Sequence, residues 1–154
     1  MEIDPLLPAT TVLGVIPARL ASTRLSRKVL RPIAGRPMLA WVYEAAIACP
    51  QLDRVVIATD SEEVAELCHQ NNWPVQLTSP DLPSGTDRVH AIAQQILADI
   101  YVNIQGDEPL LKPEHLTALL RPLRVKPVLD TIRFSVGALY DVEGLNCKKL
   151  EPPR

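Results

Sequence analysis

The chain has 154 residues, 47% of them hydrophobic, which is enough to bury one core and predicts one domain of a soluble, globular protein. Its formal net charge of −2 argues against a general nucleic-acid binder, whose affinity would depend on a basic face. No apolar run reaches the roughly 18 residues that span a bilayer, and the N-terminal sequence lacks the basic start of a signal peptide. We therefore expect a cytoplasmic protein that binds neither nucleic acid nor membrane.

The cysteines and histidines do not predict a metal site. Cys49, Cys68 and Cys147 are odd in number and lack ligand-like spacing, so we expect reduced thiols, with Cys68 packed in a helix. The histidines, at positions 69, 90 and 115, are scattered over helical segments without metal-like spacing. We assign them no catalytic role.

Strand-like and helix-like segments alternate along the chain. Apolar runs at residues 11–16, 54–59, 75–78 and 100–104 are typical of strands in a parallel sheet. Helices are predicted to open near Pro37, at an Asp60–Glu63 capping box, after a loop at 79–85, and at Pro113. Their apolar stripes are Met38, Trp41, Val42 and Ala45; Val64, Leu67 and Cys68; Val89, Ile92, Ala93 and Ile96; and Leu116, Leu119 and Leu120.

This alternation predicts an α/β fold, with a Rossmann-like, mostly parallel sheet and helices on both of its faces. We expect an N-terminal extension at 1–10 and a nucleotide-binding α/β domain at 11–120. Residues 121–154 then form a divergent, incomplete continuation of the same domain, in which residues 131–139 predict one more half-buried strand.

Two charged stretches follow predicted strands. Arg19, Arg24 and Lys28, with the hydroxyls of Ser22 and Thr23, come after the first strand and suit a polyphosphate. The carboxylates of residues 107 and 108 follow the fourth strand and suit the Mg²⁺ that accompanies a nucleotide. The dinucleotide pattern G-x-G-x-x-G and the Walker pattern are both absent, which argues against dehydrogenases and P-loop proteins.

An ordered set of motifs runs through most of residues 12–115. The motifs are Ile16-Pro17-Ala18-Arg19, Ser22-Thr23-Arg24-Leu25, Lys28, Ile33-Ala34-Gly35-Arg36-Pro37-Met38, Ala58-Thr59-Asp60, Ser84-Gly85-Thr86-Asp87-Arg88 and Asn103-Ile104-Gln105-Gly106-Asp107-Glu108-Pro109. Together they resemble the 3-deoxy-manno-octulosonate cytidylyltransferase (CMP-Kdo synthetase) family, of the nucleotide-diphospho-sugar transferase fold type. The resemblance implies an enzyme that uses Mg²⁺, transfers CMP from CTP to the sugar acid Kdo and releases pyrophosphate, as a step of lipopolysaccharide biosynthesis. It also implies a homodimer for the full-length family, which we do not extend to this chain.

The chain departs from the family pattern in two ways. Where the family typically reads Leu-Pro-Gly-Lys-Pro-Leu, this chain has Leu25-Ser26-Arg27-Lys28-Val29-Leu30, so the lysine remains while the turn before it changes. After about Leu120 the resemblance fades, and the chain is C-terminally truncated relative to the family. We therefore expect these residues alone to bind nucleotide with little or no turnover.

The resemblance implies roles for individual residues. Arg19, Lys28 and Asp107 are the expected catalytic residues, and Asp107 is the expected metal ligand. Glu108 either supports that site indirectly or is a solvated residue at the Pro109 turn. The expected nucleotide-binding residues are Pro17, Ala18, Arg19, Ser22, Thr23, Arg24, Lys28, Ser84, Gly85, Thr86, Arg88 and Gln105.

Alternatives remain open both for individual residues and for the function of the whole chain. The basic residues can form a solvated loop, and Thr86 can serve as the cap of the next helix, with or without touching nucleotide. For the whole chain, the alternatives are a related sugar-nucleotide transferase with another acceptor and a truncated copy that binds nucleotide without turnover.

Overall fold

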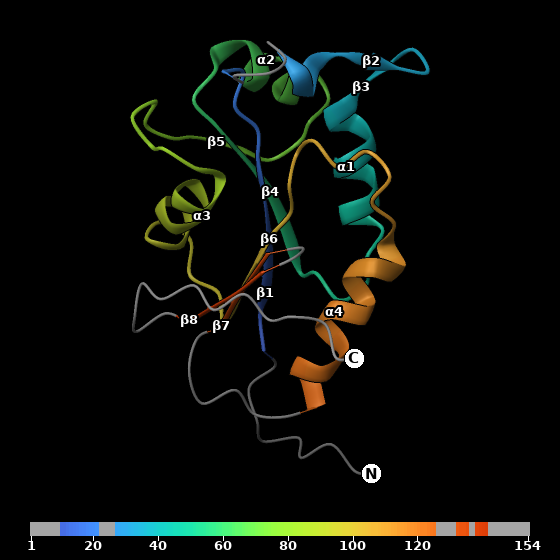
Figure 1. The fold of residues 1–154 in the computed structure, drawn as a ribbon, viewed down its shortest axis with the longest axis vertical. Coiled ribbons are helices and arrows are strands. Elements are labelled where there is room, and N and C mark those ends of the chain that lie inside the picture. Colours follow the sequence, from blue (N-terminus) through green and yellow to red (C-terminus); the bar gives the residue numbers. More distant parts are fainter. Residues whose placement is uncertain (1–9, 22–26, 126–131, 136–137, 142–154) are drawn as a thin grey trace.

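A six-stranded sheet organises the computed structural model, which describes residues 10–21, 27–125, 132–135 and 138–141 (Figure 1). The strands of this sheet are β1 (Val12–Pro17), β4 (Arg54–Thr59), β5 (Val75–Leu77), β6 (Ile100–Asn103), β7 (Ile132–Ser135) and β8 (Ala138–Asp141). The α-helices are α1 (Met38–Ile47), α2 (Glu62–Gln70), α3 (Gly85–Ala93) and α4 (Pro113–Val125). A 3-10 helix, η1 (Lys28–Leu30), precedes a small hairpin of β2 (Pro32–Ile33) and β3 (Arg36–Pro37).

The strand order β5-β4-β1-β6-β7-β8 confirms the predicted mostly parallel sheet, because only the pair β7–β8 is antiparallel. From β1 the chain adds β4 and β5 on one side, then returns to place β6 on the other side. The strand order therefore reverses between β1 and β6. Ligands of open α/β sheets bind beyond the carboxyl ends of the strands at such a reversal.

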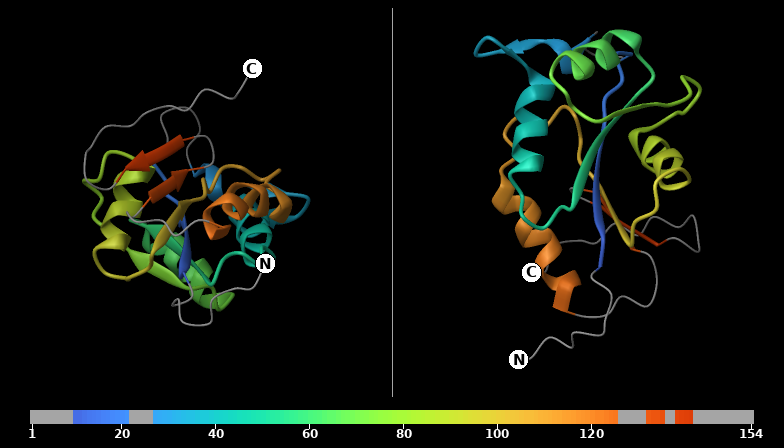
Figure 2. Two further views of the ribbon diagram at one scale, coloured as in Figure 1. Left: turned by 90° about the horizontal axis from the view of Figure 1, so that it is seen from below. Right: turned by 180° about the vertical axis from the view of Figure 1, so that it is seen from behind.

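Helices cover both faces of the sheet, as predicted (Figures 1 and 2). One hydrophobic cluster joins α1, α2 and α4 to β1, β4 and β6 through side chains such as Val42, Cys68 and Leu116. A second cluster packs Val89 and Ile92 of α3 against the opposite face. All six residues of β1 are buried, which explains why this strand reads as an uninterrupted apolar run.

The amino end of β1 is fixed by side chains from two other segments. The backbone N–H of Val12 donates to Asp53 Oδ2 at 2.7 Å, and that of Thr11 donates to Asp99 Oδ2 at 2.7 Å. At the other end, the Ala18 N–H donates to the Ala58 carbonyl at 2.8 Å, which extends the ladder one residue beyond the strand. The carboxyl end of β1 therefore has a defined direction into the segment that follows.

The hairpin β2–β3 explains why the predicted apolar stripe of α1 is partly wrong. Trp41 and Ala45 are only half buried, while Leu39, Tyr43 and Ala46 are buried instead. Trp41 faces the hairpin, because its Nε1 donates to the Ile33 carbonyl at 3.0 Å and the Arg36 guanidinium lies 4.9 Å from its ring centroid. A local tertiary contact thus overrides the helical periodicity.

Two predicted helix caps are wrong by one or two residues. Ser61, not Asp60, caps α2, and its hydroxyl accepts the Val64 N–H. Ser84, not Thr86, caps α3, so the loop predicted at 79–85 ends at Ser84 and Gly85 begins the helix. Asp60, which does not cap α2, instead pairs with Arg88.

Two further predictions differ from the structure. Ile96 lies beyond the end of α3, although it packs against the second cluster. The single strand predicted at 131–139 is represented by β7 and β8, on either side of residues 136–137, which lie outside the described residues.

Candidate functional site

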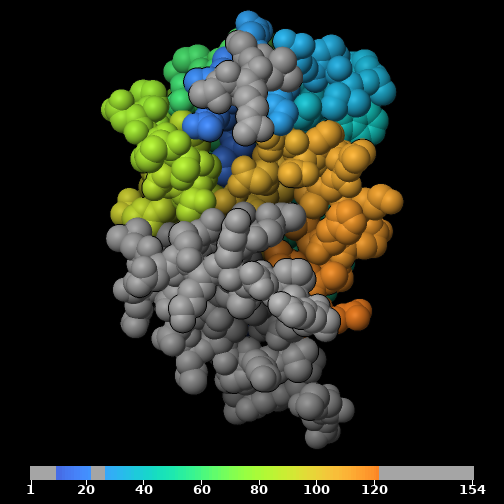
Figure 3. Space-filling view, viewed as in Figure 1, coloured from blue at the N-terminus to red at the C-terminus, as the bar shows by residue number. Residues whose placement is uncertain are grey.

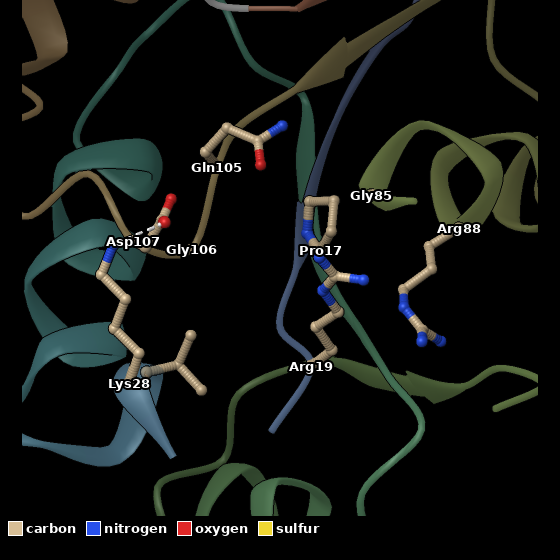
Figure 4. A pocket seen from close by; sticks show the side chains of 9 residues that line it. Pro17, Arg19, Lys28, Gly85, Arg88, Gln105, Gly106 and Asp107 are labelled. Carbon is tan, nitrogen blue, oxygen red and sulfur yellow. Dashed lines mark hydrogen bonds and ion pairs between the residues drawn. The ribbon is translucent and has the colours of Figure 1, made fainter. Parts of the chain in front are cut away.

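A pocket lies where β1, β6 and α3 meet, at the reversal of strand order (Figure 4). In the space-filling view, blue atoms of the β1 segment lie deep between the yellow-green α3 region and the orange region after β6 (Figure 3). Three cations and one carboxylate give the lining an excess of positive charge. The lining residues are Pro17, Arg19, Lys28, Val29, Gly85, Arg88, Gln105, Gly106 and Asp107.

The carboxyl end of β1 supplies Pro17 and Arg19. Pro17 ends the strand, and Arg19 is exposed, with its Nη1 donating to the Pro83 carbonyl at 3.2 Å. Arg19 therefore reaches across to the segment before α3, and its guanidinium stays accessible to an anionic ligand.

An ion pair joins the two charged stretches that the sequence singled out. Lys28 Nζ lies 2.8 Å from Asp107 Oδ2, and the two side chains are 36% and 42% exposed. Lys28 opens η1 directly after Arg27, whose φ of 57° and ψ of 31° are left-handed. This turn presents the lysine to the pocket, beside the segment that follows β6.

Two glycines of the pocket lining pack closely against Pro17. A Cβ at Gly106 would lie 2.7 Å from the Pro17 carbonyl oxygen, so only glycine fits there. A Cβ at Gly85 would lie 3.3 Å from Pro17 Cβ and 3.5 Å from Gln105 Oε1. The ends of β1, β6 and α3 are thereby packed into one compact wall.

The first turn of α3 is held by its own polar residues. Ser84 Oγ accepts the Asp87 N–H at 3.2 Å and donates to the Asp87 carboxylate. Thr86 Oγ1 accepts from Asn103 Nδ2 at 3.5 Å, while Gln105 Nε2 donates to Asn103 Oδ1 at 2.9 Å. Asn103 therefore connects α3 to the residues after β6, and the Gln105 oxygen remains beside Gly85.

Arg88 lines the pocket from α3, but its terminal nitrogens bind protein. Its side chain is 1% exposed and donates to Asp60 Oδ2 at 2.8 Å and to Thr78 Oγ1 at 2.6 Å. Arg88 Nη1 also donates to the Ser79 carbonyl at 3.1 Å. Arg88 is thus set apart from the accessible cations Arg19 and Lys28.

The pocket brings together seven of the predicted site residues, namely Pro17, Arg19, Lys28, Gly85, Arg88, Gln105 and Asp107. Ala18, Ser84 and Thr86 are adjacent in sequence to lining residues but do not line the pocket. Ser22, Thr23 and Arg24 lie outside the described residues.

Val29 and Gly106 line the pocket without having been assigned a role. Gly106 could have been found from its place between two predicted site residues at the end of a strand, where backbones approach closely. Val29 carries no comparable signal. The side chain of Glu108 is exposed and also lies outside the lining.

Within the described part of the chain, no group of three or more His, Cys, Asp or Glu side chains could hold a metal ion. Asp107 is the one carboxylate among the described lining residues, so a cation held there would need further ligands from a bound molecule or from water. None of the described helices combines the length and apolar character needed to cross a membrane.

Solved structures define the class of protein to which this fold corresponds. A structure of CMP:2-keto-3-deoxy-manno-octonic acid synthetase complexed with CTP is 38% identical, with a TM-score of 0.75 over 79% of this chain and 50% of that chain. A cytidylyltransferase from Leptospira borgpetersenii is 26% identical, with a TM-score of 0.65 over 73% of this chain and 48% of that chain. The fold is that of the nucleotidyltransferases.

The sequence model of the family described as Cytidylyltransferase matches residues 13–143, and the chain belongs to this family. The 3-deoxy-manno-octulosonate cytidylyltransferase of Acidobacterium capsulatum is 64% identical over 88% of this chain and 55% of the relative. That of Koribacter versatilis is 55% identical over 90% of this chain and 53% of the relative. The chain spans about half the length of these relatives, and the family match continues well beyond Leu120, where the motifs had faded.

Proposed function

We propose that the pocket binds CTP together with Mg²⁺ and forms the nucleotide site of a cytidylyltransferase that acts on Kdo. The observation that carries this proposal is the meeting of Arg19, Lys28 and Asp107 at the reversal of strand order. The CTP bound to the synthetase described above and the names of the relatives support the choice of nucleotide and acceptor.

Arg19 and Lys28 are the proposed phosphate-binding residues of the pocket. Both side chains are accessible, and together they offer a guanidinium fork and a compact ammonium charge to a triphosphate. Ser22, Thr23 and Arg24 are proposed to contribute further donors from the same stretch of sequence. Lys28 has three N–H donors, so it can donate to phosphate oxygens while it stays beside Asp107.

Asp107 is the proposed Mg²⁺ ligand, and its setting fits that role. Its carboxylate is partly accessible, and Mg²⁺ commonly binds proteins through one or two carboxylates together with phosphate oxygens and water. When bound, Mg²⁺ neutralises charge on the phosphates. Because Lys28 lies beside Asp107, the proposed phosphate-binding cation and the proposed metal ligand are next to each other.

The remaining predicted residues are proposed to hold the nucleoside. Pro17 and Ala18 leave room for a base beside the backbone, and Gly85 permits close approach of a ligand to the first turn of α3. The Gln105 side-chain oxygen lies beside Gly85, and the amide suits a hydroxyl of the ribose or of the sugar acid. Ser84 and Thr86 are proposed to act from the same turn, and Arg88 to support it.

The proposed reaction joins the sugar acid to the α-phosphorus of CTP. The oxygen of the anomeric hydroxyl of Kdo attacks phosphorus and gives up its proton to water, the bond to the leaving pyrophosphate breaks, and CMP-Kdo forms. No protein nucleophile is required, so catalysis depends on aligning the reactants and neutralising charge that moves toward pyrophosphate. Arg19 and Lys28 are the residues proposed to provide that neutralisation. Because CTP is supplied in the cytoplasm, we propose that the reaction takes place there.

Calorimetric titration with CTP, ATP and NAD in the presence of Mg²⁺ tests the nucleotide. We expect CTP to bind at least tenfold more tightly than either alternative, a difference of about 1.4 kcal/mol. Binding of NAD as tight as that of CTP would reject the proposed nucleotide site.

A related sugar-nucleotide transferase is the second candidate function. The observation that favours it is the set of described lining residues: those with accessible charged side chains are proposed to bind CTP and Mg²⁺, and none of them distinguishes Kdo from another sugar acid. Pyrophosphate release measured with CTP, Mg²⁺ and a panel of sugar acids separates the two candidates. A copy that only binds nucleotide would bind CTP in the first experiment and release no pyrophosphate with any acceptor in the second.

A further inference from the structure

A buried arginine connects three segments behind the pocket. The Arg88 side chain on α3 is 1% exposed, and its terminal nitrogens donate to Asp60, Thr78 and the Ser79 carbonyl. Asp60 follows β4, while Thr78 and Ser79 follow β5. Arg88 thus ties α3 to the carboxyl ends of two neighbouring parallel strands.

This connection reaches the pocket through one turn of helix. Gly85 and Arg88 are three residues apart on α3 and therefore lie on the same side of it. Gly85 packs against Pro17 at the pocket wall, and the Arg88 N–H donates to the Ser84 carbonyl at 3.3 Å. Fixing the Arg88 guanidinium consequently fixes the position of Gly85 relative to the end of β1.

The position and the partners of the guanidinium separate its role from that of the other pocket cations. Arg88 lies across the pocket from Lys28 and Asp107 (Figure 4), and its terminal nitrogens already have protein acceptors. Arg88 Nε is the one side-chain polar atom among the described residues that is buried without a hydrogen-bond partner. A buried arginine that leaves one donor unused is held by the other contacts, which must outweigh that cost.

We propose that Arg88 and Asp60 are positioning residues, which hold the first turn of α3 against the end of β1 in the geometry that binds nucleotide. This inference rests on the proposed nucleotide site. It assigns one joint role to two motifs, Ala58-Thr59-Asp60 and Ser84-Gly85-Thr86-Asp87-Arg88, that are separate in the sequence. A buried charge pair with good geometry is well suited to specifying one arrangement of the elements that it joins.

Asp60 and Thr78 give the proposal a clean test, because neither lines the pocket. A change at either residue can affect a bound ligand only through the segments that they hold. We expect Asp60→Asn to weaken Mg²⁺·CTP binding about tenfold and Thr78→Val about threefold, as measured by calorimetry. The double variant should lose less than the product of these factors, since both changes release the same guanidinium.

Asp99→Asn is the matched control. Asp99, like Asp60, is a hydrogen-bond acceptor, but its donor is the backbone N–H of Thr11 at the amino end of β1, away from the pocket. We expect this variant to bind Mg²⁺·CTP within twofold of the parent, even where its melting temperature falls as much as that of Asp60→Asn. If Asp60→Asn and Thr78→Val both bind within twofold of the parent, the proposal is wrong.

Hydrogen exchange provides a readout that needs no ligand. Asp60→Asn and Thr78→Val should speed exchange of the amides of Asp87 and Arg88 in the first turn of α3, and Asp99→Asn should not. If the parent fails to bind CTP, the proposed function fails, and this exchange pattern still decides the positioning role. If Asp60→Asn does not fold, Thr78→Val carries both measurements. Unchanged exchange in a folded variant overturns the inference.

Discussion

Lys28 and Asp107 show how two residues 79 positions apart form one part of the site. Lys28 follows Arg27 at the start of η1, and Asp107 lies in the turn after β6. Both side chains remain partly accessible. An ion pair with that exposure contributes little to stability, about 0–1 kcal/mol. Its value lies in placing a cation beside the carboxylate that is the proposed metal ligand.

We predict that Asp107→Asn weakens Mg²⁺-dependent CTP binding at least tenfold while reducing the free energy of unfolding by less than about 1 kcal/mol. The amide keeps the size of the side chain but loses the hard anionic ligand. Mg²⁺ titrations at fixed CTP, together with urea denaturation, measure the two effects. Glu108→Gln is the control, because this neighbouring carboxylate is exposed and outside the pocket lining. Coincident Mg²⁺ curves for Asp107→Asn and the parent would exclude Asp107 as the ligand.

Arg27 occupies a backbone conformation that glycine adopts more easily. Its φ is 57°, and the family pattern noted above has glycine at this position. We predict that Arg27→Gly raises the free energy of unfolding by about 0.5–1 kcal/mol, because relief of the left-handed strain exceeds the loss of the exposed ion pair with Glu63. Arg27→Ala loses the same ion pair but keeps the strain, so it should be no more stable than the parent. Equal stability of the Gly and Ala variants would contradict this explanation.

Cys68 makes the free energy of unfolding depend on pH in the alkaline range. The thiol is fully buried, and burial raises its pKa to about 11. The folded state therefore keeps the proton that the unfolded state loses, so stability is complete below about pH 9 and declines by about 2–3 kcal/mol as the pH rises to about 11. Urea denaturation at a series of pH values measures the slope. Cys68→Ala should flatten it, and an unchanged slope would assign the effect to other groups, such as Tyr43, whose pKa burial also raises.

At the scale of elements, strands were easier to predict than helix ends. Strands β1, β4 and β6 are buried on both faces, so nearly every residue in them is apolar and their bounds are visible in the sequence. Helix caps were harder, because Asp60 and Ser61 are both good N-caps and stand side by side. The choice between them depends on Arg88, 28 residues away, which engages Asp60. No local pattern contains that information.

In the candidate site, too, features that depend on local sequence were predictable, and features that depend on distant contacts were not. Pro17, Arg19 and Asp107 were predictable, because residues just after parallel strands gather at one edge of the sheet. The pairing of Lys28 with Asp107 and the burial of Arg88 depend on side-chain packing between distant segments, so the sequence did not specify them. The register of β7 on β6, such as Val102 opposite Phe134, likewise has no motif of its own.

Helix α2 offers a direct test of its cap. Ser61 Oγ accepts the Val64 N–H, and we predict that Ser61→Ala lowers the free energy of unfolding by about 1 kcal/mol. Ser61→Thr, which retains the hydroxyl, should recover most of this loss. Urea denaturation of the three proteins provides the comparison. If Ala and Thr variants are equally stable, the hydroxyl is not the stabilising group.

At the scale of the whole molecule, the two hydrophobic clusters share the central strands, while the hairpin β2–β3 belongs to neither cluster. Residues that share a core are expected to open together, and peripheral elements are expected to open locally at a lower free energy. Backbone amides of β1, β4 and β6 should therefore exchange hydrogen only on global unfolding. The amides of Ile33 and Arg36 should exchange faster, through local opening of the hairpin.

This difference predicts how nucleotide binding spreads through the fold. A ligand that binds only the folded state stabilises that state by about 2.7 kcal/mol when the ligand concentration is 100 times its Kd. Mg²⁺·CTP at that concentration should therefore slow exchange in β4, which does not line the pocket, by the same roughly 100-fold factor as in β1, whose last residue, Pro17, lines it. The hairpin amides should keep their rates, because local opening leaves the pocket intact. Hydrogen exchange followed by mass spectrometry or NMR measures all three elements in one sample. Slowing confined to the segments around the pocket would show that β4 opens independently of the site, and that the two halves of the sheet do not unfold as one unit.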